Sequence, residues 1–399
     1  MRKRGANEGT IAKRADGRWV AAVTLPNGKR KYLYAPTRAE VAVRLTAAQA
    51  ATQAGDPPIQ DERLTLKDWL DHWLENTIRP NKRASTYRYY EHTVRLHINP
   101  ELGRIRLTQL TPEHVEAWLK QKAKDGRVRP ARDKNPGLSA QSVQHLRAIL
   151  RAALGVALKR GKIRRNVATL ADGPSVKRYK APTISPDDAR AIIQAVQGDR
   201  LEALFITAIA SGLRQGEALA LRWSDVHLAK GEVTDEAIDS LDQPRVDVTA
   251  TLQRTGGQFE RVDPKTERSR RTIPIPPLVV DALRAHQDRQ AFERKTAGNL
   301  WYEGDGLCFT RPTGEPIHGS TVNHQLQALL RRADLPVIRF HDLRHGCAAL
   351  LVALGVHPRT VMEQLGHSQI SVTMNYYAGV VPALQREAAD QLGALLASK

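Results

Sequence analysis

Alternating apolar and polar positions dominate the start of the chain and predict β-strands there. Residues 9–36 alternate in this way around two turn sequences, at 15–17 and 26–28, which indicates a three-stranded antiparallel sheet. A Thr-x-x-Glu capping box then opens an expected helix at residues 37–50. The pattern therefore predicts a small domain over residues 1–55, built from three strands and one helix.

The spacing of apolar residues changes to that of amphipathic helices from Leu64 onward. Leucine and tryptophan recur every three or four residues, as a single buried helix face requires. Ser85 is expected to cap the second helix, and a proline at the first helical position should open the third. A compact helical module is predicted over residues 62–175, with helices at 64–78, 84–98, 111–126 and 139–161.

The last part of the chain combines both patterns. Helical spacing is interrupted by strand-like alternation at residues 244–275 and then resumes, ending in an amphipathic pattern at residues 380–399. The third domain is expected to span residues 181–399 as an α+β fold with a C-terminal tail helix. The whole chain is thus predicted to be multidomain and mainly α, with small β elements.

Positive charge is concentrated in the first 180 of the 399 residues. The formal net charge is +19, with 11 Lys and Arg against 4 Asp and Glu in residues 1–60, and 26 against 12 in residues 61–180. Residues 181–399 carry 24 against 26 and are nearly balanced. Such an excess attracts a polyanion through counterion release, so nucleic acid is the expected partner. A merely soluble basic protein is the alternative.

Composition argues against several other classes of protein. No stretch approaches the roughly 20 apolar residues needed to cross a bilayer, and the basic N-terminus lacks the apolar run of a signal peptide. The two cysteines, Cys308 and Cys347, have no metal-ligand spacing, so neither a zinc site nor a disulfide framework is indicated. We therefore expect a cytoplasmic protein without membrane contact.

Residues suited to chemistry gather in four stretches of the last domain. Arg214 follows a helix-ending glycine and precedes Glu217 by three residues, and Lys265 lies in a polar turn between strand candidates. His341 and Arg344 are spaced to share one face of a helix start. Each also has an ordinary structural interpretation: a helix-end ion pair for Arg214, turn solvation for Lys265, and capping or packing for His341.

The fourth stretch, LGHSQISVTMNYYAG at residues 365–379, contains His367 and two adjacent tyrosines. A helix through it would place Tyr377 on one face and Tyr376 on the next, so spacing alone does not choose a nucleophile between them. The ordinary interpretation is that the tyrosines pack in a core.

Taken in order, these stretches resemble the tyrosine recombinase, or phage integrase, family. Arg214 in Gly-Leu-Arg-x-Gly-Glu matches the family's first arginine, Lys265 matches its hairpin lysine, and the His-x-x-Arg and Leu-Gly-His motifs are also present. The resemblance covers residues 181–380 strongly and extends to the helical module by layout. It implies that the nucleophile lies ten residues after the histidine of Leu-Gly-His, which gives the catalytic set Arg214, Lys265, His341, Arg344, His367 and Tyr377.

The family's reaction is attack of a tyrosine oxygen on a DNA phosphodiester, which gives a 3′-phosphotyrosyl link and a free 5′-hydroxyl. The resemblance implies that Arg214 and Arg344 bind the phosphate oxygens and that His341 assists deprotonation. Lys265 would protonate the leaving oxygen, and His367 would donate a hydrogen bond to the phosphate. Because the covalent link stores the phosphoester, neither a metal nor another cofactor is expected.

The same resemblance implies double-stranded DNA attachment sites and a homo-tetramer on DNA, with an excisionase and a DNA-bending host factor as further partners. The N-terminal sheet would bind arm-type sites and the helical module core-type sites, and association with the bacterial nucleoid would follow. Expected DNA contacts come from cations of all three domains: Arg18, Lys29, Arg30, Lys31, Lys82, Arg83, Arg268 and Arg270.

Two alternative functions are consistent with these residues. A type IB topoisomerase uses the same cleavage chemistry but relaxes supercoils, and the dedicated N-terminal domain argues against it. A DNA-binding regulator with a decayed site is the other, and the complete set of Arg, Lys, His, Arg, His and Tyr argues against that. The function predicted is therefore a site-specific recombinase, the integrase of a phage or integrative element.

Overall fold

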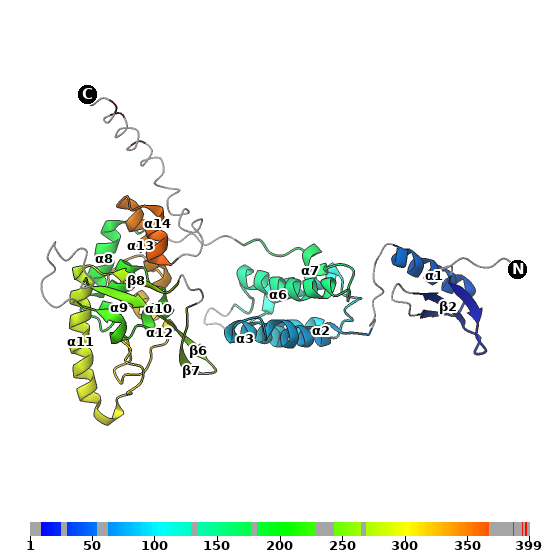
Figure 1. Cartoon of the computed structure of the whole chain (residues 1–399), viewed down its shortest axis with the longest axis horizontal. Helices are drawn as coiled ribbons and strands as arrows, with labels where there is room; N and C mark the ends of the chain where they lie inside the picture. The colour runs from blue at the N-terminus through cyan, green and yellow to red at the C-terminus, as the bar shows by residue number, and fades with distance from the viewer. Residues whose placement is uncertain are drawn as a thin grey trace. The chain divides into compact units, whose positions relative to one another are not determined.

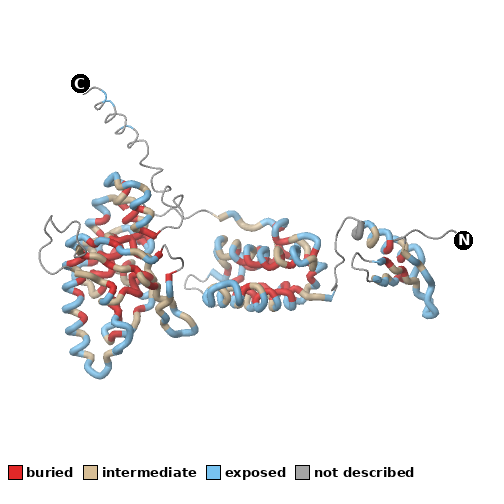
Figure 2. The backbone as a smooth tube through the Cα atoms, viewed as in Figure 1, coloured by how far each residue is buried: buried red, intermediate tan, exposed pale blue. Residues whose placement is uncertain are grey.

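Figure 1 shows the computed structural model of the whole chain. The chain divides into two compact units, Met1–Arg178 and Tyr179–Lys399. Among the described residues, the buried hydrophobic ones form two clusters in each unit. Figure 2 colours the backbone of all buried residues red. The predicted division into three domains stays a prediction. The structure describes residues 9–24, 30–53, 63–128, 135–176, 182, 184–228, 243–264, 269–366, 386, 393 and 396.

The N-terminal part has the three-stranded sheet and the helix that the sequence predicts. Its elements are β1 (Thr10–Lys13), β2 (Trp19–Thr24), β3 (Arg30–Ala35) and α1 (Arg38–Gln53). The strands pair antiparallel in chain order, and α1 packs on one face of the sheet. The hydroxyl of Thr37 accepts the N–H of Glu40 at 3.2 Å, which is one of the two hydrogen bonds of the expected capping box.

Three tryptophans lie in the core of the helical module. The indole N–H of Trp69 donates to the carbonyl of Ala153 at 3.0 Å, and that of Trp118 donates to the carbonyl of His97 at 2.8 Å. Trp73 lies with them in the same hydrophobic cluster. The elements of this module are α2 (Leu66–Trp73), η1 (Leu74–Ile78), α3 (Ala84–Thr93), η2 (Val94–Ile98), α4 (Asn99–Leu102), α5 (Pro112–Asp125), α6 (Ala140–Lys159) and α7 (Val167–Leu170).

The helices predicted at residues 64–78 and 84–98 are present, and each ends in a π-helical turn, η1 and η2. One detail of the helical prediction is wrong. Ser85 was expected at the N-cap, yet α3 begins one residue before it, with Arg83 at the N-cap and no side-chain hydrogen bond there. Ser85 therefore lies inside the first turn, where its own backbone is already helical, whereas an N-cap has extended backbone.

The second unit is built around α9, which is buried on all sides by α8, α11 and α13. A small antiparallel sheet of order β4-β5-β8 and a separate β6-β7 hairpin form the β insert. No described helix is long and apolar enough to cross a membrane.

The elements of the second unit follow the predicted order of helices, strands and helices. They are α8 (Pro186–Val196), α9 (Glu202–Ser211), α10 (Gln215–Leu219), η3 (Trp223–Asp225), β4 (Val226–His227), β5 (Arg245–Val248), β6 (Thr251–Thr255), β7 (Gln258–Val262), β8 (Arg271–Pro274), α11 (Pro277–Ala297), η6 (Gly298–Leu300), α12 (Gly319–Arg332), α13 (Phe340–Ala353) and α14 (Pro358–Leu365).

The core of the helical module predicts a large difference between two leucines of α6. Leu150 is fully buried, whereas Leu158 is 41% exposed on the same helix. Leu150→Ala should lower the free energy of unfolding by about 2–5 kcal/mol, because it leaves a cavity, while Leu158→Ala should change it by less than about 1 kcal/mol. Urea titrations followed by tryptophan fluorescence measure both. Equal losses in the two variants would contradict the assignment of this core.

Candidate active site

Arg214 is positioned by the sharp end of α9. Gly212 caps this helix with a left-handed backbone (φ 66°), and the chain then extends through Arg214 into α10. The N–H of Arg214 donates to Oε2 of Glu217 at 3.0 Å, and its Nη1 donates to Oε1 at 2.5 Å. Its Nη2 donates to the carbonyl of Gly366 at 2.9 Å. The guanidinium thus links α10 to the end of α14 while its side chain remains 38% exposed.

Arg344 lies near the start of α13 and is almost fully buried, with 3% of its surface exposed. Its two terminal nitrogens donate to the carbonyl of Gly212 at 2.6 Å and to that of Leu365 at 2.5 Å. Burial and the neighbouring guanidinium of Arg214 lower the pKa of Arg344 to about 9, although Glu217 opposes this shift. The side chain therefore stays protonated at neutral pH and can bind an anion.

Arg271 is a third guanidinium in this cluster, and the sequence analysis did not assign it a site role. It begins β8, and its side chain is 7% exposed. Its Nη2 donates to Oε2 of Glu217 at 3.0 Å, and its Nε donates to the carbonyl of Gln364 at 2.7 Å. Period-two alternation could have found it, because Arg271 shares one face of the strand with the buried Ile273.

Glu217 is the carboxylate that these arginines share. Only 4% of its surface is exposed. Burial alone would raise the pKa of Glu217, but the guanidinium of Arg271, which also donates a hydrogen bond to it, and that of Arg214 outweigh burial and lower the pKa. Glu217 is therefore ionised and holds two positive side chains beside one another.

His341 lies three residues before Arg344 on α13, as its spacing predicts. Its ring meets that of His345 edge to face, with centroids 4.8 Å apart. Solvent reaches His341, yet desolvation by the surrounding chain, then the His345 ring and the Arg344 guanidinium, lower the pKa of His341 to about 4. Its imidazole is neutral at pH 7 and can accept a proton or a hydrogen bond.

Some of the remaining predicted site residues lie outside the described part of the chain, and others lie on its surface. Lys265, His367, Tyr376, Tyr377, Lys29 and Arg268 lie outside the described residues. Two expected DNA-contacting arginines form exposed ion pairs, Arg18 with Asp16 at 2.9 Å and Arg270 with Asp263 at 2.7 Å. Lys82 and Arg83 are exposed between η1 and α3.

The strand register separates two cations that the sequence analysis placed together. Lys31 of β3 pairs with the buried Val23, so it shares the sheet face that α1 covers, and it is half-buried. Arg30 is one residue earlier and belongs to the opposite face, with the exposed side chain of Tyr32. One face of the sheet can therefore present only Arg30 of this pair to a ligand.

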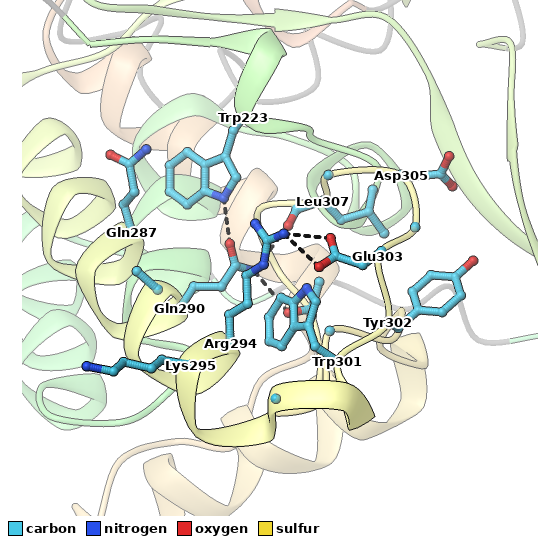
Figure 3. A pocket seen from close by; sticks show the side chains of 16 residues that line it. Trp223, Gln287, Gln290, Arg294, Lys295, Trp301, Tyr302, Glu303, Asp305 and Leu307 are labelled. Atoms are coloured by element: carbon cyan, nitrogen blue, oxygen red, sulfur yellow. Dashed lines mark hydrogen bonds and ion pairs between the residues drawn. The ribbon is translucent and has the colours of Figure 1, made fainter.

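A hollow of about 580 Å³ lies apart from the arginine cluster, at the end of α11 and the loop that follows (Figure 3). Gln290 connects its walls: Trp223 donates to its amide oxygen at 2.6 Å, and its amide nitrogen donates to the carbonyl of Leu307 at 3.1 Å. Arg294 and Glu303 form an exposed ion pair at its rim. Of the predicted catalytic residues that the structure describes, Arg214, His341 and Arg344, none lines this hollow.

Comparison with known proteins defines the family of this chain. Residues 182–381 match the phage integrase family, and residues 65–123 match the phage integrase N-terminal SAM-like domain. The chain therefore belongs to the phage integrase family. Its class is the tyrosine-type site-specific recombinases of phages and other mobile elements.

Curated relatives match this chain over nearly its whole length. It is 29% identical to an integrase of Saccharopolyspora erythraea, over 94% of each chain. It is also 29% identical to a tyrosine recombinase XerC-like protein of Caldanaerobacter subterraneus subsp. tengcongensis, over 92% of this chain and 93% of the relative.

Solved structures share the fold at lower identity. The Tn1549 transposon integrase in complex with transposon right end DNA has a TM-score of 0.64 and 20% identity, covering 83% of this chain and all of that one. A lambda integrase tetramer bound to a Holliday junction has a TM-score of 0.52 and 18% identity, covering 92% of this chain and 97% of that one. At these identities, both comparisons show that the fold is shared and nothing more.

The close approach of Gly212 to α14 makes this glycine a sensitive position. A Cβ atom there would lie 2.3 Å from Cδ2 of Leu365, and the backbone is left-handed. Gly212→Ala should lower the free energy of unfolding by about 2–5 kcal/mol, from backbone strain and overpacking together. Gly355→Ala is the control, because Gly355 has φ 72° with nothing within 4 Å, and it should lose only about 1–2 kcal/mol. Urea titrations of both variants check this, and equal losses would refute the close packing.

Protonation of His341 should weaken the fold at low pH. Its folded pKa of about 4 lies below the ordinary value of 6.5, so the unfolded chain binds more protons between these values. The contribution of neutral His341 is complete above pH 6.5 and is lost as pH falls to 4. As pH falls from 6.5 to 4, the free energy of unfolding should therefore decrease less in His341→Asn than in the unaltered protein. Urea titrations at several pH values measure this. His324→Asn, at an exposed histidine of α12, should behave like the unaltered protein.

Proposed function

We propose that this chain is the integrase of a phage or integrative element and that it cleaves DNA through a 3′-phosphotyrosyl intermediate. The observation that supports this most directly is the convergence of Arg214 and Arg344 on the carbonyls of Gly366 and Leu365. The next residue in the chain is His367, and Tyr377 follows ten residues later. A pair of guanidiniums at this place suits a phosphodiester that a nearby tyrosine attacks.

The proposed reaction exchanges one phosphoester for another. The phenol oxygen of Tyr377 attacks phosphorus, the bond from phosphorus to the 5′-oxygen breaks, and a tyrosyl phosphoester forms. Arg214 and Arg344 donate to the non-bridging oxygens, where negative charge grows in the transition state. Lys265 protonates the departing 5′-oxygen, and His367 donates a hydrogen bond to the phosphate. A 5′-hydroxyl from a second strand later reverses these steps on a new partner.

His341 is suited to receive the proton of the attacking phenol. Its neutral state at pH 7 follows from its lowered pKa, and its place three residues before Arg344 puts both on the first turns of α13. A phenol has a pKa of about 10 and needs such help, together with neighbouring cations that favour the phenolate.

General affinity for double-stranded DNA is assigned to the first two predicted domains. Residues 1–180 hold the excess positive charge, so the arm-type domain (residues 1–55) and the core-type domain (residues 62–175) would bind attachment sites through phosphate contacts. The catalytic domain (residues 181–399) would complete the enclosure of the duplex. Localisation on the bacterial nucleoid would follow from this affinity.

A homo-tetramer is the assembly that this reaction requires, because two DNA sites offer four strands for exchange. The lambda integrase tetramer on a Holliday junction, which shares this fold, supports the proposal. An excisionase and a DNA-bending host factor are proposed as further partners that set the direction of recombination.

The choice of Tyr377 as nucleophile predicts an unequal effect of two neighbouring substitutions. Tyr377→Phe should abolish the covalent adduct with a nicked suicide substrate, because phenylalanine has no attacking oxygen. Tyr376→Phe is the matched control and should still form the adduct. Denaturing gel electrophoresis detects the adduct, and peptide mapping identifies the linked residue. An adduct on Tyr377→Phe would reassign the nucleophile, and no adduct from the unaltered protein on a cognate site would end the proposed function.

A further inference from the structure

Three successive carbonyls at the C-terminal end of α14 are each held by a different arginine. Gln364 accepts from Arg271 at 2.7 Å, Leu365 from Arg344 at 2.5 Å, and Gly366 from Arg214 at 2.9 Å. The last carbonyls of a helix lack partners within the helix and carry partial negative charge, so guanidiniums suit them. The three arginines come from separate places in the chain: the start of β8, the helix α13 and the turn before α10.

The three arginines are not equivalent. Arg214 and Arg344 are the groups that the proposed function assigns to the phosphate, so DNA would compete with the helix carbonyls for their N–H groups. Arg271 differs because the proposed function gives it no phosphate contact. Its side chain is 7% exposed, and it pairs with Oε2 of Glu217, whereas Arg214 pairs with Oε1. Arg271 can keep its hydrogen bond to the carbonyl of Gln364 when the other two arginines turn toward a phosphate.

We propose that Arg271 is a positioning residue for the recombination reaction: it anchors the end of α14, from which the chain runs directly to His367 and Tyr377. Its hydrogen bond to Gln364 and its ion pair with Glu217 fix that end relative to Arg214, which Glu217 also binds. This inference rests on the proposed function for its catalytic part only. A displacement of about 1 Å at a reacting group can slow a reaction about 100-fold, which sets the scale of the expected effect.

The test compares Arg271→Gln and Arg271→Lys with a matched control in full-length protein. Single-turnover cleavage of a suicide DNA substrate should slow about 100-fold in Arg271→Gln, while the DNA dissociation constant changes less than about threefold. Arg271→Lys keeps the charge but cannot reach both partners in a fork, so it should restore part of the rate.

Arg200→Gln is the control for loss of a partly buried ion pair. Arg200 donates to both carboxylate oxygens of Glu293 at 2.6 Å and to the carbonyl of Thr310 at 2.6 Å, so it loses the same kinds of partner away from the cluster. Its cleavage rate should stay within about threefold of the unaltered protein. An equal slowing in both variants would reduce Arg271 to an ordinary contributor to the fold and overturn the proposal.

A substrate with a neutral methylphosphonate at the scissile position separates positioning from phosphate contact. Arg214→Ala should lose less rate on this substrate than on ordinary DNA, because there is less charge to neutralise. Arg271→Gln should lose the same factor on both substrates. Selective rescue of Arg271→Gln would mean that Arg271 acts on the phosphate and is not a positioning residue.

Hydrogen exchange tests the anchor without relying on catalysis. Amide exchange in residues 361–366 should speed up about tenfold or more in Arg271→Gln and stay unchanged in Arg200→Gln. If the unaltered protein forms no DNA adduct, the proposed function fails while faster exchange still supports the anchor. Unchanged exchange, or wild-type cleavage by Arg271→Gln, overturns the inference.

Discussion

The second unit depends on keeping three guanidiniums together, two of which, those of Arg271 and Arg344, are buried. Like charges in a poorly solvated place repel, and burying them is unfavourable unless each finds an opposite charge or hydrogen-bond acceptors. Here Glu217 neutralises part of the charge, and carbonyls at the ends of α9 and α14 accept most of the remaining hydrogen bonds. The helix ends and the start of β8 must therefore meet at one place, and this requirement fixes the arrangement of elements around α9.

The same balance supports the proposal that this structural cluster is also a phosphate site. Three arginines and one glutamate leave a formal excess of two positive charges, which the uncharged carbonyls only partly satisfy. A phosphodiester that gains charge in the transition state completes the balance, so the stabilisation grows along the reaction, as catalysis requires. A cluster with a second carboxylate would be more stable without DNA and less useful to the reaction.

The sequence predicted elements best where local signals were complete. Helix α5 has its N-cap at Thr111, proline at the first helical position and Gly126 at the end, as expected. The π-helical turns η1 and η2 have no local signal, because the change in hydrogen bonding depends on packing. The prediction for Ser85 was wrong because a residue's preference for the N-cap does not decide where a helix begins. Tertiary contacts decide that.

The candidate site was predicted unevenly for a related reason. The motifs around Arg214 and Arg344 give residue types at recognisable spacing, and the structure brings these two together. Arg271 stands in a run of three arginines and one serine, residues 268–271, where charge alone suggests a solvated turn. Alternation with the buried Ile273 is the one local signal, and the register of β8 against β5, which pairs Arg271 with Val248, shows that this arginine enters the interior. Its partner Glu217 is far away in sequence, so no local pattern connects them.

Charge distribution separates affinity from chemistry in this chain. Residues 181–399 carry 24 Lys and Arg against 26 Asp and Glu, so the part that holds the arginine cluster has little long-range attraction for DNA. The basic first 180 residues must supply that attraction, and screening by salt acts mainly on them. The two buried guanidiniums, those of Arg271 and Arg344, are screened far less, because little solvent reaches them. Binding can therefore weaken with salt while the reaction of a bound complex keeps its rate, a separation that a uniformly basic enzyme would not have.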